Sequence, residues 1–272
     1  LSALFEKSFH FGLDLAASYT FGHSKSVYDG TSSVAYSNWK YNYAVDSNNP
    51  GLAYSMFDIP HRVMVSVGYR TPRYAKGFMA TTVSLVYNGY VGQRYSLTMN
   101  ESYYDAEKKK TVYIDYNGDG WGGNSLLYIP TEDELQKMDF KTEEDRRKFD
   151  EWIEGDSYAK KHRGAYAMRN SNSAPWENRV DLHVAQDIFV LKDRGSKFQV
   201  TFDVTNFANM LNKKWGTTYT AAYNVMPLQV IGSKKGEDGN YTNTYAYNSR
   251  NTITKNDVLS RWHAQIGFKY IF

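Results

Sequence analysis

The chain has 272 residues, a net charge of +3 and no cysteine, and it is rich in aromatic residues, with 24 Tyr, 14 Phe and 6 Trp. Its mean hydropathy of -0.61 is that of a hydrophilic chain. It contains no run of about 18 apolar residues, which excludes an all-helical membrane protein. Without cysteine there are no disulfides or thiolate metal sites. Lys and Arg are spread among Asp and Glu, so the sequence predicts no nucleic-acid partner.

Period-two alternation is the strongest local signal, and it is typical of strands whose two faces meet different surroundings. From Phe9 to Phe21 the odd positions are apolar and the even positions are small or polar. Five further segments alternate in the same way, the cleanest from Lys197 to Thr205. We therefore predict six strands near residues 7–21, 61–71, 78–98, 179–191, 197–207 and 259–272.

The links between these strands alternate between short and long. Two are short, at 71–77 and 192–196, and three are long, near 22–60, 99–178 and 211–258. Outer-membrane barrels have short periplasmic turns and long extracellular loops. The sequence thus predicts an all-β fold, a transmembrane antiparallel β-barrel, with its last strand ending at Phe272 on the periplasmic rim.

A soluble barrel or sandwich would also alternate, with its apolar face inward. Loops of tens of residues are uncommon in compact soluble domains, however, and aromatic residues near the strand ends fit membrane girdles better. Six strands are fewer than the eight that close the smallest outer-membrane barrels. The chain starts at Leu1 with no signal peptide, so we expect further strands upstream, or a leader that has been removed.

The longest loop carries signals for two short helices. Thr131 and Glu134 have the spacing of a capping box, and Thr142 with Asp145 repeats the pattern. After the second cap, an apolar helical face is predicted by Phe149, Trp152 and Ile153. A solvated charged loop is the alternative. In the third long loop, alternation over 219–231 and the turn at 236–240 predict a hairpin, with Pro227 at an edge or bulge.

Before these helices, Asp115, Asn117 and Asp119 match the opening of a calcium loop, in which alternate oxygen ligands converge on a hard cation. The position of the bidentate Glu is occupied by Leu126, so other groups such as Asn124 would have to complete the site. The alternative is a plain turn of Asn, Asp and Gly. These three residues are the only metal ligands that we predict, and Ca²⁺ is the only cofactor considered.

Catalytic motifs are absent from the sequence. The six His do not form a zinc-binding pattern, and the Ser residues have no nucleophile elbow. The one candidate cluster, His183 with Asp181 or Asp187, is explained better by a polar row facing the lumen. The sequence therefore predicts a protein that is not an enzyme.

Several segments together resemble the C-terminal barrel of TonB-dependent receptors of Bacteroidetes type, in particular the Oar-like branch related to SusC-like transporters. The resemblance covers nearly the whole chain and departs from the family at Ser125, where Asp is usual. Its motifs are Pro60-His61-Arg62, the turn at 117–120 with the segment 124–130, Arg169-Asn170, Pro175-Trp176, the segment 206–212 and the aromatic C-terminal strand.

The resemblance implies a plugged barrel of 22 strands, of which these would be the last six, with short helices in one extracellular loop. It implies capture of a ligand by the loops and import driven by the TonB complex. That complex would act through an N-terminal plug region absent from this chain. The implied partners also include outer-membrane lipid, the barrel-assembly machinery, which reads the strand ending at Phe272, and a surface lipoprotein. A passive porin, a secretion-channel component and an adhesin-like surface barrel remain as alternatives.

Overall fold

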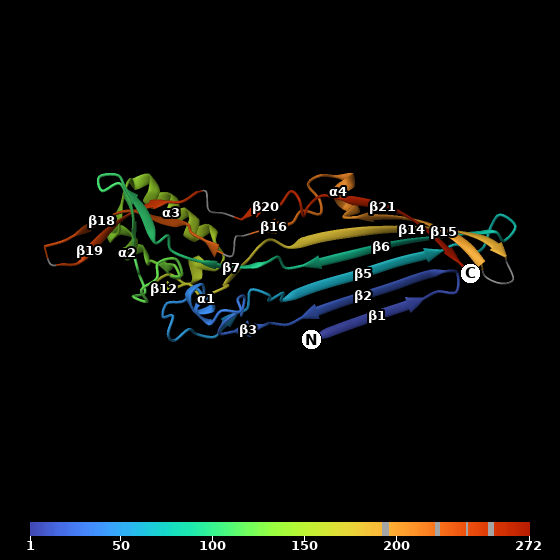
Figure 1. Ribbon diagram of the computed structural model, residues 1–272, viewed down its shortest axis with the longest axis horizontal. Coiled ribbons are helices and arrows are strands. Elements are labelled where there is room, and N and C mark those ends of the chain that lie inside the picture. Colours follow the sequence, from blue (N-terminus) through green and yellow to red (C-terminus); the bar gives the residue numbers. More distant parts are fainter. Residues whose placement is uncertain (192–195, 221–223, 238, 250–252) are drawn as a thin grey trace.

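The computed structural model describes residues 1–191, 196–220, 224–237, 239–249 and 253–272. The molecule is elongated, with a twisted sheet at one end and the long loops gathered at the other (Figure 1). Both termini lie on the sheet, at strands β1 and β21.

The sheet has seven strands in the order β1-β2-β5-β6-β14-β15-β21, and every neighbouring pair is antiparallel. Among the described residues β1 and β21 do not pair with each other, so the sheet is open at both edges. The strand bounds are Ser2–Ser8, Leu13–Phe21, His61–Arg70, Met79–Tyr90, Glu177–Leu191, Ser196–Thr205 and His263–Ile271.

The prediction of one strand over residues 7–21 was wrong, because this segment contains a hairpin turn between β1 and β2. Phe9 N–H donates to Leu13 O at 2.8 Å, and Gly12 N–H donates to Phe9 O at 3.0 Å. Gly12 has a φ of +94°, and a Cβ there would lie 2.2 Å from Arg70 O. Only glycine tolerates both conditions. Since Phe9 and Phe11 continue the alternation through the turn, six strands were predicted where the sheet has seven.

The prediction of one strand over 78–98 was also wrong. After β6 the chain leaves the sheet, and β7 (Arg94–Leu97) pairs with β13 (Asn172–Ser173) and β17 (Asn224–Val225) instead. A Cβ on Gly92 would lie 2.6 Å from Pro175 O, so this departure depends on a close backbone approach. All four residues of β7 are buried. The segment therefore belongs to the core of the loops.

The described short turns, at 9–12 and 71–78, lie at one end of the sheet and the long loops lie at the other, the arrangement predicted from the loop lengths (Figure 1). The turn residues 192–195 lie outside the described residues. We call residues 22–60 loop one, 91–176 loop two and 206–262 loop three, and together they form the loop head. Loop one contains β3 (Lys25–Ser26), α1 (Ala35–Lys40) and β4 (Ala53–Tyr54).

Loop two contains both helices predicted from capping signals. Thr131 caps α2 (Glu132–Lys137) in a complete capping box, and Thr142 caps α3 (Glu143–Gly155). Its other elements are β8 (Ser102–Asp105), β9 (Lys110–Tyr113), β10 (Tyr128–Ile129), β11 (Asp139–Phe140), the 3-10 helix η1 (Ala159–Lys161) and β12 (Ala165–Tyr166).

Loop three contains the predicted hairpin, formed by β18 (Leu228–Lys235) and β19 (Tyr241–Tyr247). Asp238, in its predicted turn, lies outside the described residues. Pro227 stands just before β18, and its carbonyl accepts from Asn248 N–H at 2.9 Å. The other elements are α4 (Phe207–Leu211), β16 (Tyr219–Thr220) and β20 (Thr254–Lys255). Helices were predicted in one loop only, whereas the structure has α1 and α4 as well.

The hydrophobic core lies in the loop head and not on the sheet. Its centre is formed by α3, whose Phe149 and Ile153 are fully buried, with β7 and the β17–β18 segment packed around them. Strand pairs join loop two to loop three, because β7 pairs with β17 and β11 pairs with β19. The core residues are Tyr95, Leu97, Met99, Leu127, Ile129, Leu135, Phe140, Phe149, Ile153, Ala159, Ala167, Val225 and Leu228.

None of the described helices is long and apolar enough to cross a membrane.

Candidate functional site

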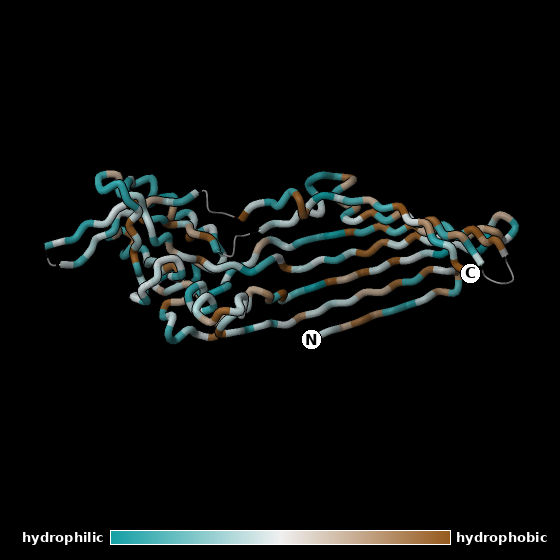
Figure 2. Tube along the Cα trace, in the orientation of Figure 1, coloured by the Kyte–Doolittle hydropathy of each residue, from teal (hydrophilic) through white to brown (hydrophobic). Residues whose placement is uncertain are grey.

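The two faces of the sheet differ in chemistry, and Figure 2 shows hydrophobic and hydrophilic positions alternating along its strands. One face collects the apolar positions: Val67 lies opposite Leu85, which lies opposite Leu182. Many of these side chains are exposed; Ile266 is 63% exposed and Phe268 is 81% exposed. An exposed apolar surface of this extent is costly in water. It is the surface that a barrel presents to lipid.

Polar clusters border this apolar face at both ends. At the loop end, Asn178 Oδ1 accepts from Tyr87 Oη at 2.7 Å and from Trp176 Nε1 at 3.2 Å. At the turn end, Gln186 Oε1 accepts from Tyr74 Oη at 2.9 Å. Asn178 and Gln186 are eight residues apart on β14, which is about 27 Å of strand at about 3.4 Å per residue. At the strand tilt of about 35–45° in outer-membrane barrels, this length spans about 19–22 Å of height, close to their apolar band of about 25 Å.

The opposite face of the sheet carries ion pairs. Asp187 is 2% exposed and accepts from Arg70 at 2.8 Å, from Lys197 at 2.7 Å and from Gln199 at 2.8 Å. These contacts link strands β5, β14 and β15 across the face. A row of paired charges is what a polar barrel interior requires.

The cluster that sequence reasoning tested for catalysis is divided in the structure. His183 Nδ1 lies 2.5 Å from Asp203 on the neighbouring strand, while Asp181 pairs with Arg179 at 3.2 Å and Asp187 takes the contacts given above. His183, Asp181 and Asp187 therefore do not form one site. Each is a member of the ion-paired polar face.

At the base of the loop head, a buried ion pair joins loop one to loop two. Arg94 on β7 donates to Asp58 Oδ2 from Nε at 3.0 Å and from Nη2 at 2.7 Å. The Asp58 side chain is 1% exposed and the Arg94 side chain 8%. Burial opposes ionisation of Asp58, but hydrogen bonds from Ser24 N–H, Arg94 and His23 outweigh it, so the pKa of Asp58 is lowered. The charge is thus compensated at the point where the two loops meet.

A second buried contact between these loops involves the Arg169-Asn170 motif. Arg169 donates to Val27 O at 2.6 Å, to Ser26 O at 2.5 Å and to Asn42 Oδ1. Asn170, whose φ is +55°, donates from Nδ2 to Tyr54 O at 2.7 Å. Both residues are 4% exposed. The sequence motif therefore holds loop one against loop two.

A cavity of about 400 Å³ lies at this junction. Loop one contributes most of its wall, including the tyrosines Tyr41 and Tyr43, and loop two contributes the two buried arginines and Asn170. Within the described part of the chain, Arg169 donates no hydrogen bond to a carboxylate, and burial lowers its pKa. A cavity with aromatic walls and a few fixed polar groups is the usual form of a small-molecule site. Sequence reasoning missed it, because the two walls come from segments that are far apart in the chain, residues 29–56 in loop one and residues 94–170 in loop two.

The predicted calcium residues lie beside the same junction. Asp119 Oδ2 accepts from Ser47 Oγ in loop one at 2.6 Å and from Asn124 Nδ2 at 2.8 Å. Asn117 Nδ2 donates to the same oxygen at 3.1 Å, and Asp115 accepts from Gly120 N–H at 2.8 Å. Burial opposes ionisation of Asp119, but these donors and Trp121 N–H lower its pKa.

In this geometry, turn and loop-one donors occupy the carboxylate oxygens. The described residues hold no cluster of three or more His, Asp or Glu placed to bind a metal. The calcium site therefore stays a prediction, and the contacts seen are those of a turn that fastens loop one.

The buried carboxylate of Glu101 lies next to this turn. It accepts hydrogen bonds from Ser125 and from Gly123 N–H, and burial raises its pKa.

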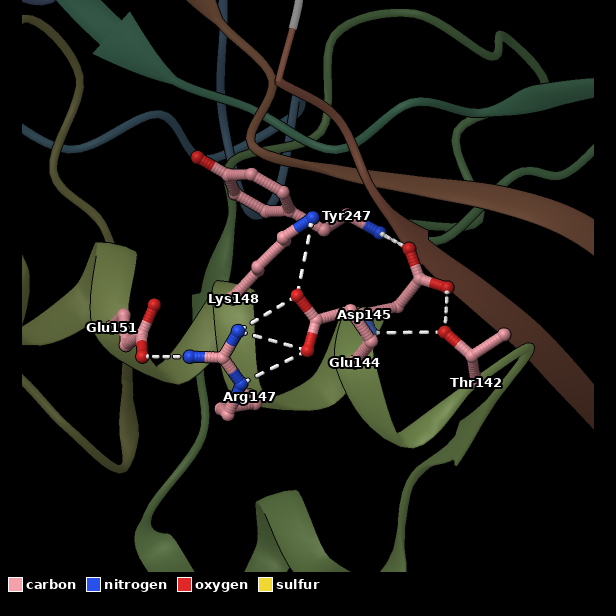
Figure 3. A network of polar contacts seen from close by, with 7 residues as sticks. All are labelled: Thr142, Glu144, Asp145, Arg147, Lys148, Glu151 and Tyr247. Carbon is pink, nitrogen blue, oxygen red and sulfur yellow. Dashed lines mark hydrogen bonds and ion pairs between the residues drawn. The ribbon is translucent and has the colours of Figure 1, made fainter.

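A polar contact at the start of α3 also fixes loop three (Figure 3). Asp145 Oδ1 accepts from Tyr247 N–H on β19 at 3.1 Å, while its other oxygen accepts from Thr142 Oγ1 at 2.5 Å. Arg147 pairs with Glu144 and Glu151 on the exposed side of the same helix. Asp145, in the first turn of α3, thus pairs with the cap residue Thr142 and also aligns the neighbouring hairpin.

These features define a protein that spans a membrane with antiparallel strands and carries a packed head of loops. The family described as outer membrane beta barrel domain matches residues 1–261. The chain belongs to this family, and the protein is located in the outer membrane. Comparison with curated proteins finds no match, and comparison with solved structures finds none.

Proposed function

We propose that this chain is the C-terminal barrel portion of a TonB-dependent receptor that captures a ligand with the loop head and imports it through a plugged barrel. In this proposal the barrel has 22 strands, and the plug and the TonB-contacting segment precede Leu1. The protein is a transporter and not an enzyme. Its partners are the TonB complex, the barrel-assembly machinery acting through the strand that ends at Phe272, and a surface lipoprotein.

The observation that carries this proposal is the cavity of about 400 Å³ between loop one and loop two. It lies in a head that stands at the end opposite the short turns, which is the extracellular end of an outer-membrane barrel. Buried ion pairs and hydrogen bonds hold its walls in place. A preformed pocket costs less ordering entropy on binding than mobile loops would. The motif resemblance to Oar-like receptors supports the same conclusion.

The experiment uses the full-length protein reconstituted in planar bilayers. A plugged receptor should conduct no steady current until its plug is unfolded by urea or deleted. Co-purification with the periplasmic domain of TonB should depend on the segment before the plug. Steady conductance by the untreated protein would refute the proposal and favour a passive channel. Absence of both conductance and TonB binding would favour a structural or adhesive barrel.

A further inference from the structure

The ammonium group of Lys40 lies among three aromatic rings at the outer side of the junction. Its Nζ is 3.3 Å from the centroid of Trp121, 5.3 Å from that of Tyr41 and 5.6 Å from that of Tyr36. The planes of Tyr41 and Trp121 are nearly perpendicular, at 88°. The three rings thus present two crossed walls to one cation, and the faces of aromatic rings attract cations within about 6 Å.

We call the rings of Tyr36, Tyr41 and Trp121 the aromatic cage. The cage is open to solvent, and the side chain that occupies it, Lys40, is flexible. Tyr36 is 60% exposed and Tyr41 is 62% exposed. Lys40 is the last residue of the six-residue helix α1. Among the described residues it forms no ion pair with a carboxylate. Rotation of the Lys40 side chain would therefore empty the cage without breaking a salt bridge, and the ring of Trp39, stacked on Tyr36 at 5.9 Å, would keep that wall in place.

The faces of the aromatic rings favour a cation over a neutral group of the same shape. A quaternary ammonium has no N–H donors, so it enters an aromatic cage without losing hydrogen bonds to water. The primary ammonium of Lys40 loses such bonds when it enters. A methylated cation should therefore compete well against the tethered lysine.

From this geometry we infer that Tyr36, Tyr41 and Trp121 form a binding site for a quaternary or methylated ammonium group, which Lys40 occupies when no ligand is bound. The inference deepens the proposed function, because it assigns a chemical class to part of the captured ligand. Tyr41 also lines the neighbouring cavity, so a ligand held by its cationic group in the cage could extend into that space. Lys40 acts as an internal competitor.

The test is isothermal titration of the detergent-purified full-length protein with choline and with tetramethylammonium. The matched control ligand is the neutral tert-butyl analogue of choline, which has the same shape without the charge. Lys40→Ala should raise the affinity for choline roughly two- to fivefold, the change that corresponds to one exposed cation–π contact. Trp121→Ala should abolish saturable binding. Trp215→Ala, at an exposed tryptophan of loop three, should leave binding unchanged.

Tyr36→Leu provides a second cage variant at a well-exposed position, where misfolding is not expected, and it should weaken choline binding. Heat-modifiable gel mobility verifies the fold of each variant. Equal binding of choline and its neutral analogue would overturn the inference, and so would equal binding by the Trp121 and Trp215 variants or no saturation in Lys40→Ala. Conductance and TonB binding are measured separately, so failure of the cage leaves the test of the proposed function intact.

Discussion

Replacing Asp58 by Ala should open the loop head, because it removes the only carboxylate that Arg94 contacts in the described structure. The Asp58 carboxylate accepts hydrogen bonds from Arg94 Nη2 at 2.7 Å, from Arg94 Nε at 3.0 Å and from Ser24 N–H at 2.6 Å. It is almost completely buried. Breaking a buried pair by removing one partner costs about 3–5 kcal/mol, since the remaining charge stays buried and uncompensated. That is a large part of the total stability of about 5–15 kcal/mol typical of a domain.

At about 1.4 kcal/mol per factor of ten, this loss raises the population of open heads by roughly a hundredfold to a few thousandfold. Limited proteolysis of the detergent-purified protein measures that population, because cleavage of a transiently opened segment follows its equilibrium when reclosing is fast. The cleavage rate within loop one should increase in proportion. Urea titration of tryptophan fluorescence gives the free energy independently.

Two controls make the result specific. Asp257→Ala removes an exposed pair with Lys255 at 3.7 Å and should cost less than about 1 kcal/mol. The double variant Asp58→Ala with Arg94→Met should be more stable than Asp58→Ala alone, since no unpaired charge remains. If Asp58→Ala resists proteolysis as well as Asp257→Ala does, then the buried pair does not hold the two loops together.

Four further outcomes are expected. The pKa values of Asp58 and Asp119 are lowered in the fold, so both carboxylates stabilise the head at a pH above the ordinary Asp pKa of about 4. Protease resistance should fall as the pH drops below that value. Burial raises the pKa of Glu101, so the sign is opposite: the fold loses stability as the pH rises above the ordinary pKa of about 4.5, and Glu101→Gln should flatten this fall in the urea stability. If the predicted calcium site exists, calcium should protect loop one from proteolysis in the wild type and not in Asp119→Ala; equal protection in both would count against it. Phe149→Ala should destabilise the head by about 3–5 kcal/mol in urea and leave the heat-modifiable mobility of the sheet unchanged.

Signals between neighbouring residues predicted much of this structure. The capping residues Thr131 and Thr142 lie three positions from their acidic partners, so both helices could be read directly. The alternation of the strands was equally local. By contrast, helix α1 follows Val34, which has no side chain that can cap it, and no starting signal marks it. The turn at Gly12 was missed because the aromatic alternation continues through it.

Contacts between distant residues could not be predicted from one sequence. Asp58 and Arg94 are separated by the whole of β5 and β6, and only the register of those strands brings them together. The cage has the same origin, since Tyr41 and Trp121 come from different loops. Arg169 stood out as a motif, but two of its partners are the backbone carbonyls of Ser26 and Val27, which no residue type reveals. The predicted calcium residues do lie together, although the role that the structure gives them is to fasten loop one.

The position of the hydrophobic core has a consequence for the order of assembly. Its residues come from loop two and loop three, which alternate along the chain with strands of the sheet. Val225 and Leu228 can reach Leu97 and Phe149 only after β14 and β15 have brought loop three beside loop two. We therefore expect the loops to cross the membrane unfolded, and the head to fold last, on the extracellular side, after the strands have inserted. The folded head would be too large to pass back between the strands, so its folding would fix the strands in the membrane.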